Sequence, residues 1–322
     1  MAKVAVGVDI GGTNLKFGLV TEKGLVIARK RKSTKASEGP AKVIGRIRQG
    51  VSELAEKAHE VGHRLAGIGL GTPGIISAAD GVVRLCPNMP GWVDIPLAAL
   101  AGQGMDAPVY IENDANAYAL GEHWQGAGRG TGSMVCLTLG TGVGGGIVIG
   151  GKVWHGADGM AGEVGHLTVN PKGPLCGCGN HGCLERYSSA TAVVEMAVES
   201  LLKGSASSLA GLYRENPSAL TARRIMEAAR SGDRLSLKVY NMAGVYLGIA
   251  IADMINLLNI ERVVIGGGMA GAWELFAGPM NSEISKRAFR IPAERCSVVR
   301  GELGDDAGII GSASLAFKGR KA

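Results

Sequence analysis

The sequence contains a compact group of metal-ligand residues. Cys176, Cys178 and Cys183 lie within one glycine-rich segment, CGCGNHGC, and His166 lies a short way upstream. Three thiolates and one imidazole form a closed tetrahedral set, which is typical of a structural zinc rather than a water-activating one. His181, inside the segment, is an alternative fourth ligand. A disulfide is the rival interpretation, but the third cysteine and an expected reducing compartment argue against it.

A second candidate is the acidic residue Asp114, in the segment Glu112-Asn113-Asp114, which joins an expected strand to an expected helix. Ligands of open α/β sheets collect at the carboxyl ends of the strands. A carboxylate there can accept the proton of a hydroxyl group that attacks phosphorus. The competing interpretation is an N-cap, since Asp and Asn are preferred directly before a helix. Asn113 can cap the helix while Asp114 reaches the ligand, so both roles stay open.

Two matched glycine turns predict phosphate binding. Gly11-Gly12-Thr13, followed by Asn14, and Gly140-Thr141-Gly142 each link two apolar segments, which gives the repeat DIGGT–LKFGLV and LTLGTG–GGGIVIG. Backbone N–H groups in such turns converge on an anion. Asp9 can hold Mg²⁺ through water, and Lys16 can add positive charge nearby. Closure of a hairpin is the alternative role, but two copies of the motif favour phosphate.

A third glycine segment, Gly266-Gly267-Gly268, follows the apolar residues 262–265 and precedes an expected helix. We interpret it as a wall for the adenosine of a nucleotide. An ordinary strand-to-helix turn is the alternative. The sequence has no GxxxxGK[ST] motif, which excludes a P-loop enzyme. It also has no complete GxGxxG motif after an early strand, which disfavours a dehydrogenase.

Two carboxylates flank the cysteine segment. Glu163 lies shortly before His166, and Glu185 shortly after Cys183. If His166 gives one ring nitrogen to zinc, the other can donate a hydrogen bond to a substrate hydroxyl. Carboxylates and amides that line one site suit a polyol better than an apolar ligand. Solvated surface charges are the alternative interpretation of both glutamates.

The elements that must position these residues follow from hydrophobic periodicity. We expect strands over residues 4–9, 15–20, 25–29, 66–71, 109–111, 133–139, 145–149 and 262–265, and helices over residues 40–60, 115–124, 235–258 and 307–317. The repeat and the length of 322 residues predict two α/β domains. We place the smaller domain at residues 1–115 plus about 305–322, and the larger one, with the cysteine segment, at residues 116–304. Residues 204–220 fall outside the motifs, and we assign them no role.

The composition suits a folded enzyme, with 46% hydrophobic and 19% charged residues. The formal charge is +6, part of it in residues 29–32 and in Lys318, Arg320 and Lys321, but no nucleic-acid-binding module accompanies it. The start of the chain does not resemble a signal peptide, and we find no run of about 18 apolar residues to span a membrane. We therefore expect a cytoplasmic protein without nucleic-acid or membrane partners.

Taken together, these motifs resemble the ROK family (repressors, open reading frames and kinases), and within it the bacterial glucokinases. The resemblance rests on DIGGTN, ENDANAYALGE, LGTGVGGG and HGADGMAGEVGH, and most specifically on PKGPLCGCGNHGCLE. It implies an α/β, two-domain actin-like ATPase (ribonuclease H-like) fold with nucleotide and sugar in the interdomain cleft. No helix-turn-helix domain precedes the first expected strand, so the DNA binding of the family's repressors is not expected here.

The resemblance also implies a role for each candidate residue. Asp114 would be the catalytic base. The sugar would be bound by Asn88, Asn113, Asp114, Glu163, His166 and Glu185. The zinc ligands would be His166, Cys176, Cys178 and Cys183, although in some relatives a histidine inside the loop, here His181, is a ligand. We assign the nucleotide and its Mg²⁺ to Asp9, Gly11, Gly12, Thr13, Asn14, Lys16, Gly140, Thr141, Gly142, Gly266, Gly267 and Gly268.

The implied activity is ATP-dependent phosphorylation of a hexose with Mg²⁺ and a structural zinc, and glucose is the first choice of substrate. N-acetylmannosamine, N-acetylglucosamine, fructose and allose are alternative substrates, and polyphosphate is an alternative donor. A sugar-sensing protein without turnover is a further alternative, although a base at Asp114 argues against it. A thiol redox protein that uses the CxC pair is another, which a zinc assay would separate. Relatives are usually homodimers, so we expect a homodimer or a larger homo-oligomer.

Overall fold

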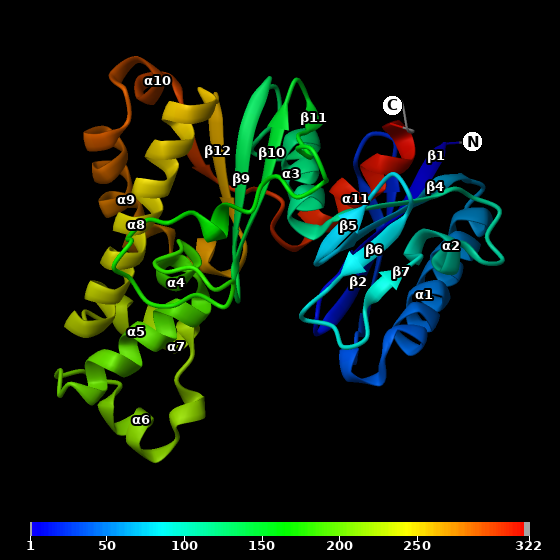
Figure 1. Cartoon of the computed structure of the whole chain (residues 1–322). Helices are drawn as coiled ribbons and strands as arrows, with labels where there is room; N and C mark the ends of the chain where they lie inside the picture. The colour runs from blue at the N-terminus through cyan, green and yellow to red at the C-terminus, as the bar shows by residue number, and fades with distance from the viewer. Residues whose placement is uncertain (1, 319–322) are drawn as a thin grey trace. The chain divides into compact units, whose positions relative to one another are not determined.

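The computed structural model describes residues 2–318 of the chain (Figure 1). Its contacts divide the chain into two compact units. Unit 1 consists of Met1–Cys136, Gly146–Gly162 and Gly301–Ala322, and unit 2 of Leu137–Gly145 and Glu163–Arg300. The domain boundaries expected from the sequence stay a prediction, and residues 319–322 of its last segment lie outside the described residues.

Unit 1 is built on a five-stranded sheet with the order β3-β2-β1-β4-β8. The strands are β1 (Lys3–Ile10), β2 (Asn14–Thr21), β3 (Val26–Ser33), β4 (Arg64–Thr72) and β8 (Val109–Asn113). The first three are antiparallel neighbours, whereas β1, β4 and β8 run parallel. Parallel strands end at the same edge of a sheet, and the register places Asp9 beside Gly71 and Thr72 beside Asn113. This edge therefore carries two of the predicted site residues.

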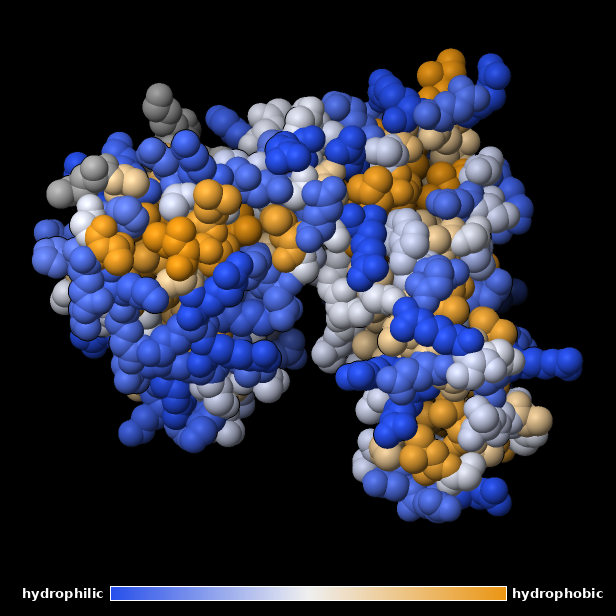
Figure 2. All heavy atoms as spheres, turned by 180° about the vertical axis from the view of Figure 1, so that it is seen from behind, coloured by the Kyte–Doolittle hydropathy of each residue, from blue (hydrophilic) through white to orange (hydrophobic). Residues whose placement is uncertain are grey.

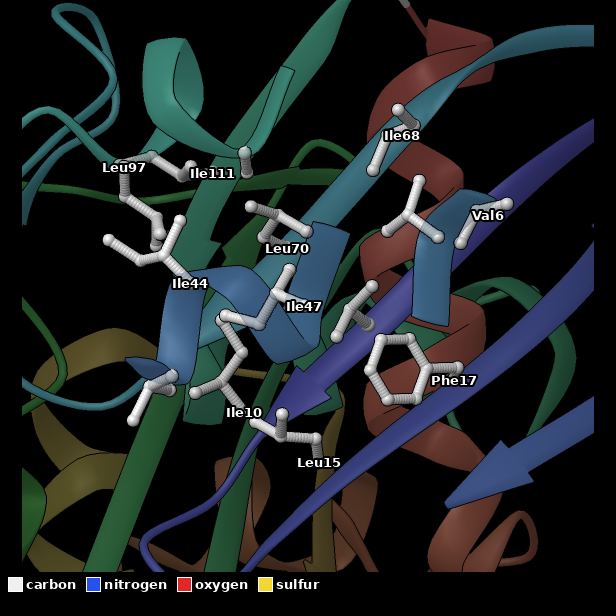
Figure 3. Packing of buried hydrophobic residues seen from close by; sticks show 14 of the residues in the cluster. Val6, Ile10, Leu15, Phe17, Ile44, Ile47, Ile68, Leu70, Leu97 and Ile111 are labelled. Carbon is white, nitrogen blue, oxygen red and sulfur yellow. The ribbon is translucent and has the colours of Figure 1, made fainter. Parts of the chain in front are cut away.

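One face of this sheet is covered by α1 (Pro40–Glu60) and α2 (Leu97–Gly102). Figure 3 shows Ile44 and Ile47 of α1 among the strand side chains of Ile10, Leu15 and Phe17, all of them buried. The apolar positions of α1 recur with the period of a helix, and the helix expected over residues 40–60 is confirmed. A small sheet, β5 (Ile75–Ser77), β6 (Val82–Leu85) and β7 (Val93–Ile95), completes this side of the unit.

The opposite face is covered by α11 (Ala307–Lys318), which also packs against α3 (Asp114–Gln125). Two glycines allow backbones to touch here. A Cβ at Gly69 of β4 would lie 1.8 Å from the Ser312 carbonyl oxygen, and one at Gly121 of α3 would lie 2.1 Å from that of Ala307. The C-terminal helix therefore holds both the parallel strands and α3, the helix that begins at Asp114.

A second five-stranded sheet has the order β11-β10-β9-β12-β13. Its strands are β9 (Ser133–Leu139), β10 (Val143–Ile149), β11 (Lys152–Val153), β12 (Arg262–Gly266) and β13 (Ser297–Arg300). The division between the units cuts through β9 and β10. The hairpin of β9 and β10 repeats the plan of β1 and β2, as the sequence repeat predicts.

Unit 2 is organised around α8 (Arg234–Leu258). The remaining helices are α4 (Glu185–Ser188), α5 (Ala190–Leu202), α6 (Ala210–Glu215), α7 (Ala222–Arg230), α9 (Trp273–Arg287) and α10 (Arg290–Arg295). A Cβ at Gly244 or Gly248 of α8 would lie 2.4 Å from a carbonyl oxygen of α9, so these two helices pack closely. Asp233 caps the first turn of α8, and Asn259 ends the helix with a left-handed backbone (φ 51°).

Within the described residues, α8 is the one helix long and apolar enough to cross a membrane, judged by length and composition. Half of its most apolar window (50%) is buried inside the structure, as in the core helix of a folded domain. Figure 2 shows hydrophobic residues gathered at α10, where Phe289 and Ile291 are exposed; Leu257, at the end of α8, is exposed as well.

Candidate active site

The first glycine turn links β1 to β2. The Gly11 N–H donates to the Asn14 carbonyl oxygen at 2.9 Å. The buried Thr34 holds the turn from the side, because its N–H donates to the Thr13 carbonyl (2.9 Å) and its hydroxyl to the Gly11 carbonyl (2.5 Å). Gly12 is exposed, and a Cβ there would meet no atom within 4 Å. The turn is thus fixed in place and presents an open backbone, as phosphate binding requires.

Asp9, at the end of β1, lies beside the turn and opposite Lys16 of β2. The Lys16 Nζ is 3.6 Å from Asp9 Oδ2 and 3.0 Å from Asp305 Oδ1. Burial raises the pKa of Asp9, while the charge and hydrogen bond of Lys16 act in the opposite direction. The structure therefore brings a partly buried carboxylate and an ammonium group together next to the phosphate-sized turn. Asp305 was not singled out by the sequence, because it lies far from both along the chain.

The end of β8 separates the roles of Asn113 and Asp114. Asn113 is the N-cap of α3: its Oδ1 accepts from the backbone N–H of Ala115 (2.9 Å) and of Asn116 (3.2 Å), and its Nδ2 donates to the Gly74 carbonyl (3.3 Å). Asp114 is the first helical residue, is half-buried, and accepts from the Ala115 N–H at 2.9 Å. The capping role considered for this segment thus belongs to Asn113.

Asn88 is an exposed residue of the loop between β6 and β7. The neighbouring Cys86 connects it to Asp114. Burial raises the pKa of the Cys86 thiol, the backbone N–H of Asn88 lowers it by hydrogen bonding, and the charge of Asp114 raises it further. Asn88 and Asp114 therefore both affect the pKa of one thiol of unit 1.

Glu112 and His155 have no role predicted from the sequence, although both stand inside the quoted motifs. His155 Nε2 lies 2.8 Å from Glu112 Oε2, and Glu112 is buried (3% exposed). The available signal was a carboxylate inside a strand, which needs a partner when buried. Nothing in the spacing identifies that partner, because His155 lies 43 positions away.

The four candidate zinc ligands come together in unit 2. One ligand atom from each of His166, Cys176, Cys178 and Cys183 lies within 4.8 Å of all the others. The Cys176 Sγ is 3.7 Å from His166 Nδ1, and the Cys178 Sγ is 3.6 Å from the Cys183 Sγ. Such spacings fit a tetrahedral ion with Zn–S bonds of about 2.3 Å. The alternative ligand His181 is engaged elsewhere, with its Nδ1 3.1 Å from the Gly173 carbonyl oxygen.

His166 presents its two ring nitrogens to different neighbours. While Nδ1 lies near Cys176, Nε2 lies 4.0 Å from Glu163 Oε2. His166 ends the short helical turn η2 (Val164–His166), which begins directly after Glu163. This turn leaves both side chains partly exposed to solvent. The arrangement therefore allows one nitrogen to bind a metal and the other to bind a substrate hydroxyl.

Glu185 supports the second glycine turn. Its Oε2 accepts from the Val143 N–H at 2.9 Å, and a Cβ at Gly142 would lie 2.2 Å from the same oxygen. The turn is closed by the Gly140 N–H, which donates to the Gly142 carbonyl at 2.9 Å. Gly165 packs closely on β10, since a Cβ at Gly165 would lie 2.2 Å from the Val143 carbonyl oxygen. The turn, Glu185 and the backbone beside His166 are thus neighbours.

The segment Gly266–Gly268 lies next to this turn. Gly267 has a positive φ of 83°, and a Cβ there would lie 2.4 Å from the carbonyl oxygen of Leu139, which directly precedes Gly140. The following helical turn, η4 (Gly268–Ala272), starts at an open position, since a Cβ at Gly268 would meet no atom within 4 Å. Both glycine segments of unit 2 therefore meet at one edge of the second sheet.

Comparison with known proteins gives matches along almost the whole chain. The model of the ROK family matches residues 5–318. The glucokinase of Thermotoga maritima is 39% identical over 310 residues, which cover 96% of each chain. The glucokinase of Halalkalibacterium halodurans is 40% identical over 311 residues, which cover 96% of this chain and 94% of that one. A xylose repressor of Caldicellulosiruptor bescii is 33% identical over 310 residues, which cover 96% of this chain and 77% of the repressor.

Among solved structures, the chain is similar to a ROK family glucokinase from Streptomyces griseus in complex with glucose and AMPPNP. The two are 34% identical, with a TM-score of 0.82, and the match covers 98% of this chain and 100% of that one. A ROK hexokinase from Thermus thermophilus is 33% identical with a TM-score of 0.79, and the match covers 98% of each chain.

Proposed function

The chain belongs to the ROK family, and we propose that it transfers the γ-phosphoryl group of ATP to glucose, giving glucose 6-phosphate and ADP. Its α/β architecture is the two-domain actin-like ATPase (ribonuclease H-like) fold of the family's glucokinases. The observation that carries the proposal is the nearly full-length similarity to glucokinases, one of which holds glucose and AMPPNP in its solved structure. The chain is thus an ATP-dependent hexose kinase.

Asp114 acts as the base in this proposal. It accepts the proton of the sugar hydroxyl as that oxygen attacks phosphorus, a step that contributes about 10²–10⁴-fold in rate. Its place at the carboxyl end of β8 and the separate capping by Asn113 support the role, since capping does not depend on Asp114. Phosphoryl transfer relies mainly on positioning and charge neutralisation, so the rigid start of α3 is part of the mechanism.

Sugar hydroxyls are bound by Asn88, Asn113, Asp114, Glu163, His166 and Glu185. Carboxylates accept hydrogen bonds from hydroxyl groups, and His166 Nε2 can donate one. The position of Nε2 near Glu163 supports their joint contact with the sugar. Glucose is the preferred substrate in this proposal. N-acetylmannosamine, N-acetylglucosamine, fructose and allose are the alternatives, because only a few contacts distinguish sugars that differ in one substituent.

The nucleotide phosphates bind to the turns Gly11–Asn14 and Gly140–Gly142, and Gly266–Gly268 borders the adenosine. Asp9 holds Mg²⁺ through water, and Lys16 neutralises phosphate charge. The open backbone of the first turn and the Asp9–Lys16 pair beside it support this assignment. Polyphosphate is the alternative donor.

His166, Cys176, Cys178 and Cys183 hold a structural zinc, which ties down a loop that has few apolar residues. The close approach of the four ligand atoms supports this set over one that includes His181. Bound in this way, His166 is fixed with Nε2 toward Glu163. The side chains of the loop thereby orient the sugar-binding residues without taking part in the transfer.

A cytoplasmic location and a homodimer or larger homo-oligomer complete the proposal. None of the six cysteines, all of them within the described residues, forms a disulfide, which supports a reducing compartment. A sugar sensor without turnover is the second candidate, and the similarity to a xylose repressor favours it specifically. Such a sensor would bind sugar, as a kinase does, but it would not consume ATP.

A coupled ADP-release assay with a panel of hexoses, each with a no-sugar control, tests the proposal. We expect release that depends on sugar and is fastest with glucose. Release with another hexose would retain the kinase and change the substrate. Sugar binding by zinc-replete protein, with neither ADP release from Mg-ATP nor hexose phosphate formed from polyphosphate, would favour the sensor.

A further inference from the structure

Glu112 is a buried carboxylate that the proposed mechanism does not use. It stands on β8 directly before the Asn113–Asp114 junction and is 3% exposed. A carboxylate removed from water is costly unless its oxygens are hydrogen-bonded or paired with a cation. Its partners therefore indicate what the residue is for.

Each Glu112 oxygen has a distinct task. Oε1 accepts from the Asn113 N–H at 3.0 Å and from the Asn116 Nδ2 at 3.1 Å. Asn113 is the N-cap of α3 and Asn116 lies in its first turn, so Oε1 ties the end of β8 to the start of the helix. Asp114 lies between these two contacts in sequence. The orientation of its backbone thus depends on how Glu112 is held.

His155 holds the other oxygen. Its Nε2 lies 2.8 Å from Glu112 Oε2. The hydrogen bond to Glu112 raises the pKa of His155, with burial acting in the opposite direction. The two residues come from different elements, β8 and the loop after β11, so the pair is a tertiary contact within unit 1.

The backbone of the His155 loop is itself constrained. The neighbouring Trp154 N–H donates to the Ile147 carbonyl at 2.8 Å, and the Ala161 N–H donates to the His155 carbonyl at 3.0 Å. A Cβ at Gly159 would lie 3.1 Å from the Ile76 carbonyl oxygen, so the loop also touches β5. The loop that carries His155 is therefore held in place independently of Glu112. His155 can thus orient the Glu112 side chain.

We propose that His155 and Glu112 are positioning residues of the kinase reaction, which fix the Asn113–Asp114 junction so that the base faces the sugar hydroxyl. The proposal rests on the proposed function, in which Asp114 is the base. Neither residue of the pair is assigned contact with the substrate. Loss of the Glu112–His155 contact should therefore lower kcat while leaving the KM for ATP nearly unchanged.

Three variants test the pair. His155→Ala removes the donor, whereas His155→Gln keeps an amide N–H near the position of Nε2. His123→Gln is the matched control, because His123 is also a half-buried histidine of unit 1, with its Nε2 2.9 Å from the Thr131 carbonyl. We expect kcat to fall about 10–100-fold in His155→Ala, since misplacing a reacting group by about 1 Å costs up to ~10²-fold. In His155→Gln and His123→Gln, kcat should stay within about threefold of the unsubstituted enzyme, given the retained hydrogen-bond donor.

Hydrogen–deuterium exchange of the peptide that covers residues 112–118 gives a readout independent of activity. Exchange should be faster in His155→Ala than in the unsubstituted protein and His123→Gln, with the melting temperature recorded for all variants. The positioning role of the pair would be refuted if exchange and kcat were unchanged in His155→Ala. It would also be refuted if His155→Gln lowered kcat and raised exchange as much as His155→Ala. Absence of sugar-dependent ADP release in the unsubstituted protein would instead overturn the kinase, and exchange would still decide whether the pair holds the junction.

Discussion

Asp114 and Asn113 are adjacent, yet hydrogen bonding gives them different tasks. Asn113 satisfies the backbone N–H groups of Ala115 and Asn116, which otherwise lack partners at the start of a helix. Because Asn113 caps the helix, replacing Asp114 should affect chemistry much more than folding. In the cysteine loop, too, individual side chains have distinct tasks: the proposed zinc ligands would fix the conformation of a loop that has few apolar residues.

Asp114→Ala should reduce kcat by about 10²–10⁴-fold, the usual contribution of a general base. Glucose affinity, measured by calorimetry, should change only a few-fold, because the other sugar-binding side chains remain. Asp158→Ala, a change of an exposed acidic residue of unit 1, is the control and should leave kcat unaffected. Turnover preserved in Asp114→Ala would remove the residue from the role of base.

Cys178→Ser should lose zinc and weaken sugar binding together, because the tetrahedral set is broken and His166 is released. Zinc content measured by mass spectrometry of the purified protein, with glucose titration on the same sample, checks both effects. Cys296→Ser is the control, since Cys296 lies before β13, outside the cluster. Full zinc content in Cys178→Ser would refute the ligand set, and zinc loss in His181→Ala would restore the alternative ligand.

At the scale of elements, caps and close backbone contacts decide how α3, α8 and α11 are held. Asp233 caps α8: its Oδ1 accepts from the Ser236 N–H at 2.9 Å and its Oδ2 from the Ser208 N–H at 2.7 Å. Partial burial raises the pKa of Asp233, but these hydrogen bonds outweigh it and lower the pKa from 3.8 to about 2. The ionised cap therefore stabilises unit 2 above pH 3.8, and this stabilisation is lost as pH falls through about 2.

Asp233→Ala should lower the free energy of unfolding by about 0.5–2 kcal/mol at neutral pH. The gap between variant and unsubstituted protein should shrink as pH falls from 3.8 to about 2, because the unfolded chain then binds a proton at Asp233 while the folded cap is still ionised. Thermal unfolding across this pH range measures the gap. Thr221→Ala removes the cap of α7, whose hydroxyl does not titrate, so its gap should stay constant. An Asp233→Ala gap that is equally independent of pH would contradict the assignment.

Gly121→Ala should destabilise unit 1 by about 1–3 kcal/mol, the usual cost of overpacking. The added Cβ would lie 2.1 Å from the Ala307 carbonyl oxygen, so α3 and α11 must separate. Gly45→Ala in α1 is the matched control, because a Cβ there meets no atom within 4 Å. That change should be stabilising by about 0.5–1 kcal/mol through helix propensity. Urea unfolding checks both, and equal effects of the two substitutions would exclude the close contact.

Long elements with regular apolar spacing could be predicted from the sequence. The helices expected over residues 40–60, 235–258 and 307–317 correspond to α1, α8 and α11. The small sheet of β5 to β7 was missed because strands of three or four residues show too little alternation. The helices α5 to α7 were not assigned either. The helix expected after Gly266–Gly268 corresponds to η4 and α9, but its bounds were not predicted; α9 contains Pro279, which weakens a helix pattern.

The candidate site likewise has parts that could be predicted from the sequence and parts that could not. The cysteine loop and the glycine turns are local motifs, so the sequence displays them directly. The Glu112–His155 pair and the contact of Lys16 with Asp305 join positions 43 and 289 residues apart, and no periodicity encodes such contacts. Conversely, the cap at Asn113 could be predicted as one of two alternatives, since it depends only on neighbouring residues.

At the scale of the whole molecule, the proposed transfer reaction depends on residues of two units that have related hairpin turns. Unit 1 carries the predicted base and the first turn, while unit 2 carries the cysteine loop, Glu163, Glu185 and the second turn. Similarity to glucokinases extends over 96% of the chain and therefore includes both units. The function belongs to the chain as a whole rather than to either unit.

The most direct test follows the phosphoryl group itself. Purified protein is incubated with glucose, Mg²⁺ and ATP labelled at the γ-phosphate, and the products are separated. We predict that the label appears in glucose 6-phosphate in the same amount as ADP is formed, and that Asp114→Ala slows both by the same factor of about 10²–10⁴. Label found only in inorganic phosphate, or remaining in ATP while glucose is bound, would contradict the claim that this chain is a glucose kinase.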